Sequence, residues 1–444
     1  MVKKILVANR GEIALRILRA CKELNIKTVV VHSTADEKEM FVRLADESVC
    51  IGPPQVKDSY LNIPSIISAA TIANVDAIHP GIGMLSENSE FAKIVNDHGF
   101  NFIGPKAEHI ETMANKIKAK NFAKSLGLPI IPGSNKNIKN LTEAKNIATE
   151  LGYPILIKAS NGGGGRGIKK VFDEHTLKDN FLLAKQEAVQ SFGNDNVYIE
   201  KFIENPRHIE VQIIGDKNGR MIHIGERECS IQRRNQKIIE ECPSPGISNA
   251  ERQKVYDLTL TAFRDIGYQS LGTIEYLYSK GEFYFIEMNT RLQVEHTISE
   301  EVFNIDLVKE QINVASGGKL SFDQKDIKEN CHSIECRINA ENPLTLFPST
   351  GLVKTYHPPG GPGIRIDSLL YSGCSVTSFY DGLVAKIISK GKDRKECIMR
   401  LIRALDEYVI EGIDTNIQAL KLILNHKNFR EAKFDISWYD KINS

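Results

Sequence analysis

The sequence predicts a mixed fold, with an α/β domain at the N-terminus and two strand-rich α+β regions after it. In the first third of the chain, short apolar segments alternate with helical patterns. From about residue 151 the apolar segments follow one another directly, and after about residue 320 they become shorter and are separated by Pro and Gly turns. Alternation is typical of a parallel sheet wound with helices, whereas consecutive strands favour antiparallel pairing.

Length, charge and composition restrict the class of protein. The 444 residues allow roughly two to four domains. The 57 Lys and Arg residues nearly balance the 56 Asp and Glu residues, which argues against nucleic acid as the main partner. No apolar run approaches the ~20 residues of a membrane span. The eight cysteines include no Cys-x-x-Cys pair, which favours reduced thiols in the cytoplasm over disulfides or a zinc site.

The first domain is expected to end near residue 114. Its first helix, residues 12–24, carries apolar residues at helical spacing, so one face can pack on a sheet. Each later apolar segment runs into a Pro or Gly that stops it. The expected strands are residues 4–8, 28–33, 76–81 and 101–105.

The rest of the chain divides near residue 330. The second region opens on a strand, a glycine loop and a second strand, and the third closes on a helix at residues 394–408. The strands expected in the second region are 152–160, 168–173, 196–205, 207–216, 221–228, 271–280 and 282–290. Those expected in the third are 333–340, 351–358, 363–370 and 383–390.

The glycine loop is the segment NGGGGRG at residues 161–167. Glycine allows backbone N–H groups to close on phosphate oxygens without obstruction by side chains. Lys158, at the end of the preceding strand, could reach the same phosphates. The loop matches neither a Walker A sequence nor the dinucleotide-binding pattern. The segment is therefore either a phosphate-binding loop or a flexible loop beside a solvated lysine.

A second polar group lies on two expected strands. Glu275 and Glu287 interrupt apolar segments, where acids are costly to bury unless they are paired or bind a metal. Oxygen ligands of this type suit Mg²⁺, so metal binding or catalysis is favoured over an exposed edge strand. If the segment stays extended to residue 295, one face carries Glu287, Asn289, Arg291, Gln293 and Glu295.

The segment 227–237 is strongly basic. Such a cluster either binds an anion or is a solvated face. On an earlier strand, His208 and Glu210 share a face, although a histidine on a strand is more often structural than catalytic. The polar residues of the basic segment include Arg227, Gln232, Arg233, Arg234 and Lys237.

Together these motifs resemble the biotin carboxylase family, the ATP-grasp component of acetyl-CoA carboxylase and related biotin-dependent carboxylases. The similarity runs from ILVANRGEIALRI to the end of the chain, and it includes ANRGEIA, HPG…LSEN, KAS-x-GGGGRG, NPRHIE, ERECS-x-QRR, EMNTR-x-QVEH, ECRINAE and YDGLVAK in the family's order. It implies an N-terminal Rossmann-like domain (1–114), a central ATP-grasp domain (115–330) with a mobile lid at about 131–203, and a strand-rich C-terminal domain (331–444).

The resemblance implies a ligase that carboxylates biotin with ATP and bicarbonate through carboxyphosphate. In acetyl-CoA carboxylase this half-reaction leads to malonyl-CoA and fatty acid biosynthesis. The implied nucleotide contacts are Lys116, Lys158, Gly164, Gly165, Glu200, Lys201, Phe202, Ile203, His208, Gln232, Asn235, Glu275 and Glu287. Two Mg²⁺ or Mn²⁺ ions would be held by Glu275, Glu287 and Asn289.

The remaining implied roles concern bicarbonate and biotin. Glu295 resembles the base that deprotonates bicarbonate, and Arg337 the arginine that stabilises the enolate-like oxygen of the ureido ring. Bicarbonate would be held by Lys237, Arg291, Gln293 and Val294, and the neighbourhood of biotin would include Arg16 and Ile82.

Partners follow from the same resemblance. No Met-Lys-Met sequence of the kind that carries biotin occurs in the chain, so biotin is expected on a separate biotin carboxyl carrier protein. A separate carboxyltransferase and a homodimer are also expected.

Five positions depart from the family pattern. Ile82 and Met84 replace aromatic residues, and Asn235 replaces a histidine, so it can donate a hydrogen bond but cannot carry a charge near pH 7. Thr297 replaces a proline and Asn161 a glycine. We interpret these changes as neutral drift in preference to altered biotin affinity or an altered acceptor.

Three other functions compete with the main interpretation. The same half-reaction could serve another acyl-CoA or pyruvate carboxyltransferase. A nucleotide-binding regulatory subunit without catalysis is a second alternative, against which the intact motifs argue. An ATP-grasp ligase that joins a carboxylate to an amine is a third, and it would be expected to lack ECRINAE.

Overall fold

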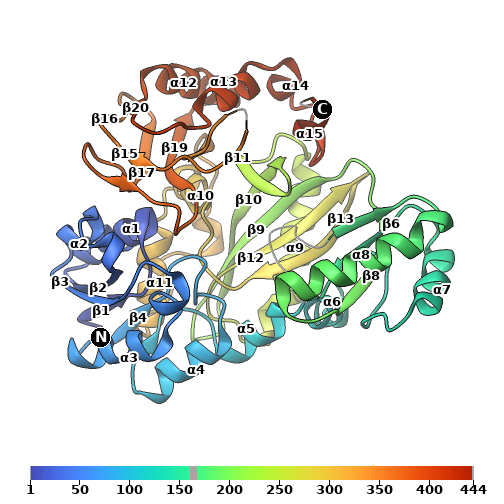
Figure 1. Ribbon diagram of the computed structural model, residues 1–444, viewed down its shortest axis with the longest axis horizontal. Helices are drawn as coiled ribbons and strands as arrows, with labels where there is room; N and C mark the ends of the chain where they lie inside the picture. Colours follow the sequence, from blue (N-terminus) through green and yellow to red (C-terminus); the bar gives the residue numbers. More distant parts are fainter. Residues whose placement is uncertain (1, 161–167, 344, 443–444) are drawn as a thin grey trace.

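The computed structural model describes residues 2–160, 168–343 and 345–442 (Figure 1). The predicted glycine loop, with Gly164 and Gly165, therefore lies outside the described residues. The N-terminal region (blue in Figure 1) lies beside the red C-terminal region, and a small green unit projects from the far side of a long central sheet.

A five-stranded parallel sheet with strand order β3-β2-β1-β4-β5 forms the N-terminal domain. Its central strands carry buried apolar side chains at successive positions, as expected for a parallel sheet covered on both faces. The α/β prediction is confirmed here. The elements are β1 (Lys4–Val7), α1 (Gly11–Glu23), β2 (Lys27–Ser33), α2 (Met40–Leu44), β3 (Glu47–Gly52), α3 (Ile63–Ile72), β4 (Ala77–His79), α4 (Ser89–Asp97), β5 (Asn101–Phe102) and α5 (Ala107–Ala114).

An eight-stranded antiparallel sheet forms the centre of the molecule. It crosses the predicted boundary at residue 330, because β11 pairs with β14: Ile239 lies opposite Cys336, and Glu240 opposite Glu335. The second and third regions therefore share one sheet. In spatial order its strands are β13 (Glu282–Asn289), β12 (Ser270–Ser279), β9 (Arg207–Gly215), β10 (Met221–Arg233), β11 (Gln236–Cys242), β14 (His332–Asn339), β19 (Leu383–Gly391) and β17 (Ile364–Ser368).

The projecting unit contains a three-stranded antiparallel sheet, ordered β7-β6-β8. Strands β6 (Ile155–Ala159) and β7 (Ile168–Val171) flank the predicted glycine loop, which confirms the strands expected on its two sides. Together with β8 (Val197–Lys201), they pack on α7 (Leu141–Leu151) and α8 (Glu174–Phe192) around a separate apolar core.

Helix α10 (His296–Phe303) packs against β10, β11, β14 and β19, and so presents the turn before it to the middle of the large sheet. The helix predicted at residues 394–408 is confirmed as α12 (Arg394–Glu407). The remaining elements are α6 (Lys116–Ser125), α9 (Asn249–Phe263), α11 (Leu307–Ala315), α13 (Ile417–Asn425), α14 (Lys427–Arg430), α15 (Trp438–Ile442) and the short strands β15 (Gly351–Leu352), β16 (Thr355–His357), β18 (Ser375–Val376) and β20 (Val409–Glu411).

Candidate active site

Lys237, on β11, lies at the centre of a cluster of buried acids. Its Nζ is 2.6 Å from an oxygen of Glu210, 2.9 Å from Glu275 and 2.7 Å from Glu295. Burial alone lowers the pKa of Lys237, but the three carboxylates outweigh this effect and raise the pKa well above its ordinary value. The ammonium group therefore stays charged, and it is directed at the same space as the three acids.

Glu295 is fully buried between two cations. Besides Lys237, it accepts a hydrogen bond from Arg337 Nη2 at 3.1 Å, and Arg337 Nε donates to Glu240 at 2.6 Å. Burial raises the pKa of the Glu295 carboxyl, but Lys237 and then Arg337 lower it more strongly, to below the ordinary range. The structure thus brings together the three side chains that the sequence predicted for bicarbonate and biotin chemistry.

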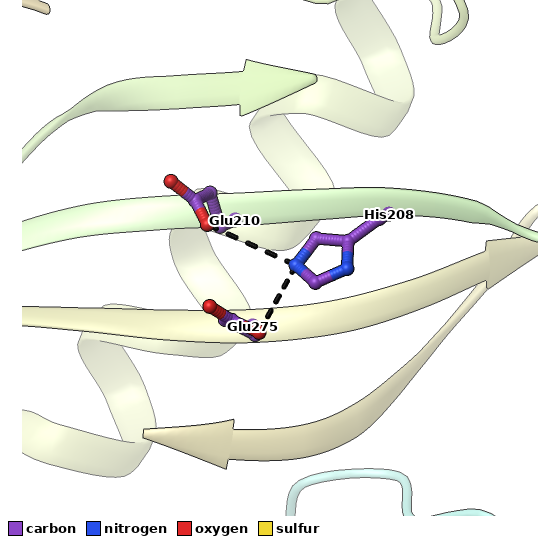
Figure 2. Close-up of side chains that lie close together, drawn as sticks. All are labelled: His208, Glu210 and Glu275. Atoms are coloured by element: carbon purple, nitrogen blue, oxygen red, sulfur yellow. Dashed lines mark ion pairs between the residues drawn. The ribbon is translucent and has the colours of Figure 1, made fainter. Parts of the chain in front are cut away.

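His208 joins Glu275 and Glu210 on the face of strands β9 and β12 (Figure 2). His208 Nε2 lies 3.0 Å from Glu275 and 3.8 Å from Glu210, and its Nδ1 is 3.1 Å from the amide nitrogen of Gln232. The predicted shared face of His208 and Glu210 is confirmed. Burial raises the pKa of Glu275, but Lys237 and His208 lower it to well below its ordinary value, so this carboxylate is ionised.

Glu275 and Glu287 occupy opposite positions on the paired strands β12 and β13. A β-bulge follows this pair, and Asn289 Nδ2 donates to Glu275 at 2.8 Å. Two carboxylates and an amide oxygen from adjacent strands are the hard oxygen ligands that Mg²⁺ prefers, so the residues present fit a divalent cation that also binds phosphate oxygens. The described residues also contain two compact buried groups of potential ligands, one of His208, Glu210 and Glu275 and one of Glu210, Cys229 and Glu295.

The expected extended face from residue 287 to 295 is wrong beyond Asn289. Strand β13 ends there, residues 290–295 form a turn, and α10 begins at His296. The turn folds the later side chains back onto the sheet: Gln293 donates to Glu275 at 3.1 Å, and Arg291 donates to Asn289 at 3.0 Å. The residues still converge, although by a turn and not by alternation along a strand. The Val294 carbonyl accepts a hydrogen bond from Lys386 at 2.8 Å.

The N-terminal domain supplies a residue that the sequence analysis did not assign. Glu87 accepts a hydrogen bond from Arg291 Nε at 2.7 Å and another from the Thr290 backbone N–H at 3.1 Å. The sequence did contain an indication of this residue, because Glu87 lies in the LSEN motif. Ile82, in the same segment, is partly buried against the core, and its carbonyl accepts a hydrogen bond from Asn9.

Four of the predicted nucleotide contacts are linked by ion pairs on the projecting unit and at the edge of the large sheet. Lys116 is 3.2 Å from Glu287, and Lys158 is 2.7 Å from Glu200. Lys120, which the sequence analysis did not select, lies 3.1 Å from the other oxygen of Glu200. Burial raises the pKa of Glu200, but Lys158 and Lys120 lower it below its ordinary value.

The three residues after Glu200 continue out of β8. The side chain of Lys201 turns to the Gly152 and Tyr153 carbonyls, at 2.8 and 3.1 Å. The ring of Phe202 lies 3.5 Å from Lys170 Nζ, and Ile203 is half-buried. The ammonium group of Lys201 therefore has two backbone carbonyls as partners.

The basic segment is neither one anion site nor one solvated face. Lys237 enters the site, Arg227 is fully buried and donates to Glu210, and Arg233 forms a two-pronged pair with Glu341.

Asn235 lies in the β10–β11 turn with φ of +64°, next to Arg234 at +49°. Asparagine tolerates this left-handed backbone better than most residues, which gives a local reason for Asn235.

Arg16 does not join the other predicted substrate residues. Its Nη2 donates to Glu300 at 2.6 Å and to Asp306 at 2.7 Å, and it lines a polar cavity with Arg19 and Arg365. Helix α1 thus directs this side chain toward α10 and the start of α11, where two acids neutralise it, and the expected place of Arg16 near Arg337 stays a prediction.

Family models match almost the whole chain. They are the biotin carboxylase N-terminal domain at residues 1–110, the ATP-binding domain of the carbamoyl-phosphate synthase L chain at 115–322, and the biotin carboxylase C-terminal domain at 335–441. Among the described residues, no helix is long and apolar enough to cross a membrane.

Individual proteins are similar over their full length. The biotin carboxylase of Pseudomonas aeruginosa is 52% identical over 442 residues, which cover 99% of this chain and 98% of the relative. The crystal structure of a Campylobacter jejuni biotin carboxylase–β-γ-ATP complex has a TM-score of 0.97 and 45% identity, with 99% of both chains covered. The biotin carboxylase domain dimer of the Hydrogenobacter thermophilus 2-oxoglutarate carboxylase, with MgADP and bicarbonate, has a TM-score of 0.96 and 45% identity, with 100% of this chain and 98% of that chain covered.

Proposed function

This chain belongs to the biotin carboxylase family, and we propose that it carboxylates biotin with ATP and bicarbonate, the first half-reaction of a biotin-dependent carboxylase. One observation carries the proposal: a buried carboxylate, Glu295, lies within hydrogen-bond distance of both Lys237 and Arg337, beside acids that suit a divalent cation. A base between cations is what an anionic, weakly nucleophilic substrate such as bicarbonate requires.

ATP would bind between the projecting unit and the large sheet. We assign Lys116, Lys158 and Glu200 to this contact, because Lys116 pairs with Glu287 at the edge of the large sheet and Lys158 pairs with the buried Glu200 on the projecting unit. Bound Mg²⁺ or Mn²⁺ would neutralise charge on the phosphates, and Glu275, Glu287 and Asn289 would hold two such ions. The other proposed contacts are Gly164, Gly165, Lys201, Phe202, Ile203, His208, Gln232 and Asn235.

Bicarbonate would bind in the turn before α10. Lys237 and Arg291 attract the anion, and Gln293 with the Val294 backbone orients it, so that one oxygen lies in line with the γ-phosphoryl group. Glu295 takes the proton of bicarbonate as that oxygen attacks. Its low pKa in the ion-paired arrangement makes it a weak base, so we expect its basicity to rise when the substrates occupy Lys237 and Arg337.

The resulting carboxyphosphate would break down to CO₂ and phosphate. Phosphate then takes the ureido proton of biotin, while Arg337 stabilises the negative oxygen of the ring and the nitrogen attacks CO₂. Water would hydrolyse carboxyphosphate, so closure of the lid at about residues 131–203 has a clear purpose. The proposed domain division is 1–114, 115–330 and 331–444.

We propose a separate biotin carboxyl carrier protein as the source of biotin, and a carboxyltransferase as the consumer of carboxybiotin. The match to 98% of the Pseudomonas aeruginosa biotin carboxylase supports the first, and the domain dimer of the Hydrogenobacter thermophilus enzyme supports a homodimer. The free state of all eight cysteines supports a cytoplasmic location. We propose that the chain works in acetyl-CoA carboxylase, in fatty acid synthesis. The alternative is a carboxylase with another acceptor, which the similarity to the 2-oxoglutarate carboxylase supports.

The test is ATP hydrolysis by the purified chain with Mg²⁺, with and without bicarbonate and with free biotin. Hydrolysis that requires bicarbonate and rises with biotin is the expected result. ATP binding without bicarbonate-dependent hydrolysis would contradict the proposal and favour a regulatory subunit. Co-purification from the native host then identifies the acceptor through the carboxyltransferase.

A further inference from the structure

Lys386, on β19, lies at the junction of three parts of the molecule. Its side chain is fully buried, with Nζ 2.8 Å from the Val294 carbonyl and 3.3 Å from Glu12 Oε2. Glu12 belongs to the first turn of α1 in the N-terminal domain, and Val294 to the turn before α10. One ammonium group on a C-terminal strand thus contacts both the N-terminal domain and the predicted bicarbonate-binding turn.

The charge of this lysine is retained despite complete burial. Burial lowers the pKa of Lys386, but the acids Glu12 and Asp367 raise it above its ordinary value. A buried cation is costly unless its partners are well placed, and a charged donor forms a stronger hydrogen bond to a carbonyl than a neutral one does. The contact with Val294 is therefore strong.

The position of that carbonyl matters for the site. Val294 lies outside any strand, so no sheet ladder fixes its backbone. Its carbonyl shares a planar peptide unit with the nitrogen of Glu295, and a donor that holds the oxygen also fixes the orientation of that unit. The side chains on either side of Val294, Gln293 and Glu295, are the ones that contact Glu275 and Lys237.

We propose that Lys386 is a positioning residue for bicarbonate: it holds the Val294–Glu295 peptide in the geometry that the reaction needs, and it does not touch the substrates. The inference rests on the proposed function. Reacting groups must be held to within a fraction of an ångström, and a turn without ladder hydrogen bonds needs such an anchor.

Steady-state ATP hydrolysis by Lys386→Met, against a matched control, tests the proposal. The control is Lys390→Met on the same strand, because Lys390 is partly exposed and lies 3.7 Å from Glu301, away from the turn. For Lys386→Met we expect the half-saturating bicarbonate concentration to rise about tenfold, with half-saturating ATP changed by less than about twofold. Lys386→Arg, which keeps the charge and a donor, should recover part of the loss, and Lys390→Met should match the wild type.

Unchanged bicarbonate dependence in a folded Lys386→Met protein would overturn the inference, as would an equal rise for ATP and bicarbonate, which indicates a merely structural role. If Lys386→Met does not melt cooperatively, the comparison is made between Glu12→Gln and the double variant Glu12→Gln/Lys386→Met. The double variant removes both charges and so leaves no unpaired buried acid at position 12. The bicarbonate effect should then appear only in the double variant, and its absence there overturns the inference. A wild-type chain without bicarbonate-dependent hydrolysis would instead refute the proposed function.

Discussion

The two large sheets of this molecule bury very different side chains. In the parallel sheet of the N-terminal domain, Val29, Val30 and Val31 follow one another on β2, and all are inaccessible to solvent. In the eight-stranded sheet, Glu210 and Arg227 are equally inaccessible and lie on neighbouring strands, where Arg227 donates to Glu210 and Gln212. One sheet is held by apolar packing, and the other contains paired charges in its middle.

We therefore expect the two sheets to contribute differently to the stability of the fold and to catalysis. Apolar burial stabilises a fold directly, whereas a buried ion pair at best recovers the cost of removing its charges from water. The buried charges of the antiparallel sheet therefore add little net stability, and the proposed roles of Lys237 and Glu275 give a chemical reason for two of them. Substitutions in the parallel sheet should change the free energy of unfolding, and substitutions in the site should change the rate.

The largest effect is expected for Glu295→Gln. It removes the proposed base while Lys237 keeps Glu210 and Glu275 as partners, so the fold should survive. Bicarbonate-dependent ATP hydrolysis should fall by about 10²–10⁴-fold, the usual contribution of a general base. Initial rates measure this, with Glu301→Gln on α10 as the control that should retain activity. A loss of less than tenfold would remove Glu295 from the role of base.

The second prediction concerns the apolar parallel sheet. Ile5→Ala on β1 leaves a cavity in a fully buried apolar layer, so the free energy of unfolding should fall by about 2–5 kcal/mol. The half-saturating concentrations of ATP and bicarbonate should stay the same. Urea unfolding with steady-state kinetics checks both, and Ile72→Ala, at a position 80% exposed, is the control for stability. A changed bicarbonate dependence would mean that the two sheets are energetically coupled.

The third prediction uses pH. Burial raises the pKa of Glu335 to about 8 from an ordinary 4.5, so between these values the folded chain holds a proton that the unfolded chain has lost. Stability should fall as pH rises through this range, by up to about 1.4 kcal/mol per pH unit, and level off above pH 8. Glu335→Gln lacks this titration, so its unfolding free energy should depend less on pH. Urea titrations at pH 6, 7, 8 and 9 measure the unfolding free energy of both proteins. The same dependence on pH in the wild type and in Glu335→Gln would contradict the prediction.

The smallest effect is expected for the double variant Ile82→Tyr/Asn235→His, which restores the family pattern. Asn235 suits its left-handed backbone and Ile82 packs against the core, so both residues have local reasons. Kinetic constants for biotin and bicarbonate should change by no more than about twofold. A larger change would show that these positions tune substrate handling and would overturn the interpretation of neutral drift.

Motifs and local patterns predicted much of this structure. The alternation of strands and helices gave the parallel sheet, and the period of two placed His208 and Glu210 on one face of β9. Glu275 and Glu287 were singled out because acids inside apolar strands are costly to bury. The roles of Lys237 and Arg337 came only from the resemblance to the family.

Long-range geometry could not be predicted in this way. The pairing of β11 with β14 joins segments far apart in the chain, and no local period encodes it. The turn after Asn289 ended the expected alternation of side chains along the strand. Arg16 lies in the ILVANRGEIALRI segment that resembles the family, but α1 directs its side chain toward Glu300 on α10. Glu87 lies in a sequence motif, but its role became clear only through its partner Arg291, and Lys120 became visible only through its partner Glu200.

The β11–β14 pairing also sets an order of events during synthesis. Strand β11 ends at Cys242 and β14 begins at His332, so the ribosome must add about 90 residues before the second can meet the first. At translation speeds of about 5–20 residues per second, this interval lasts roughly 5–20 s. Arg337 arrives with β14, after Lys237, Glu275 and Glu295 have been made. The nascent chain can therefore assemble its proposed nucleotide side before the arginine that we propose acts on biotin is present, and the proposed reaction centre is completed only by the last quarter of the polypeptide.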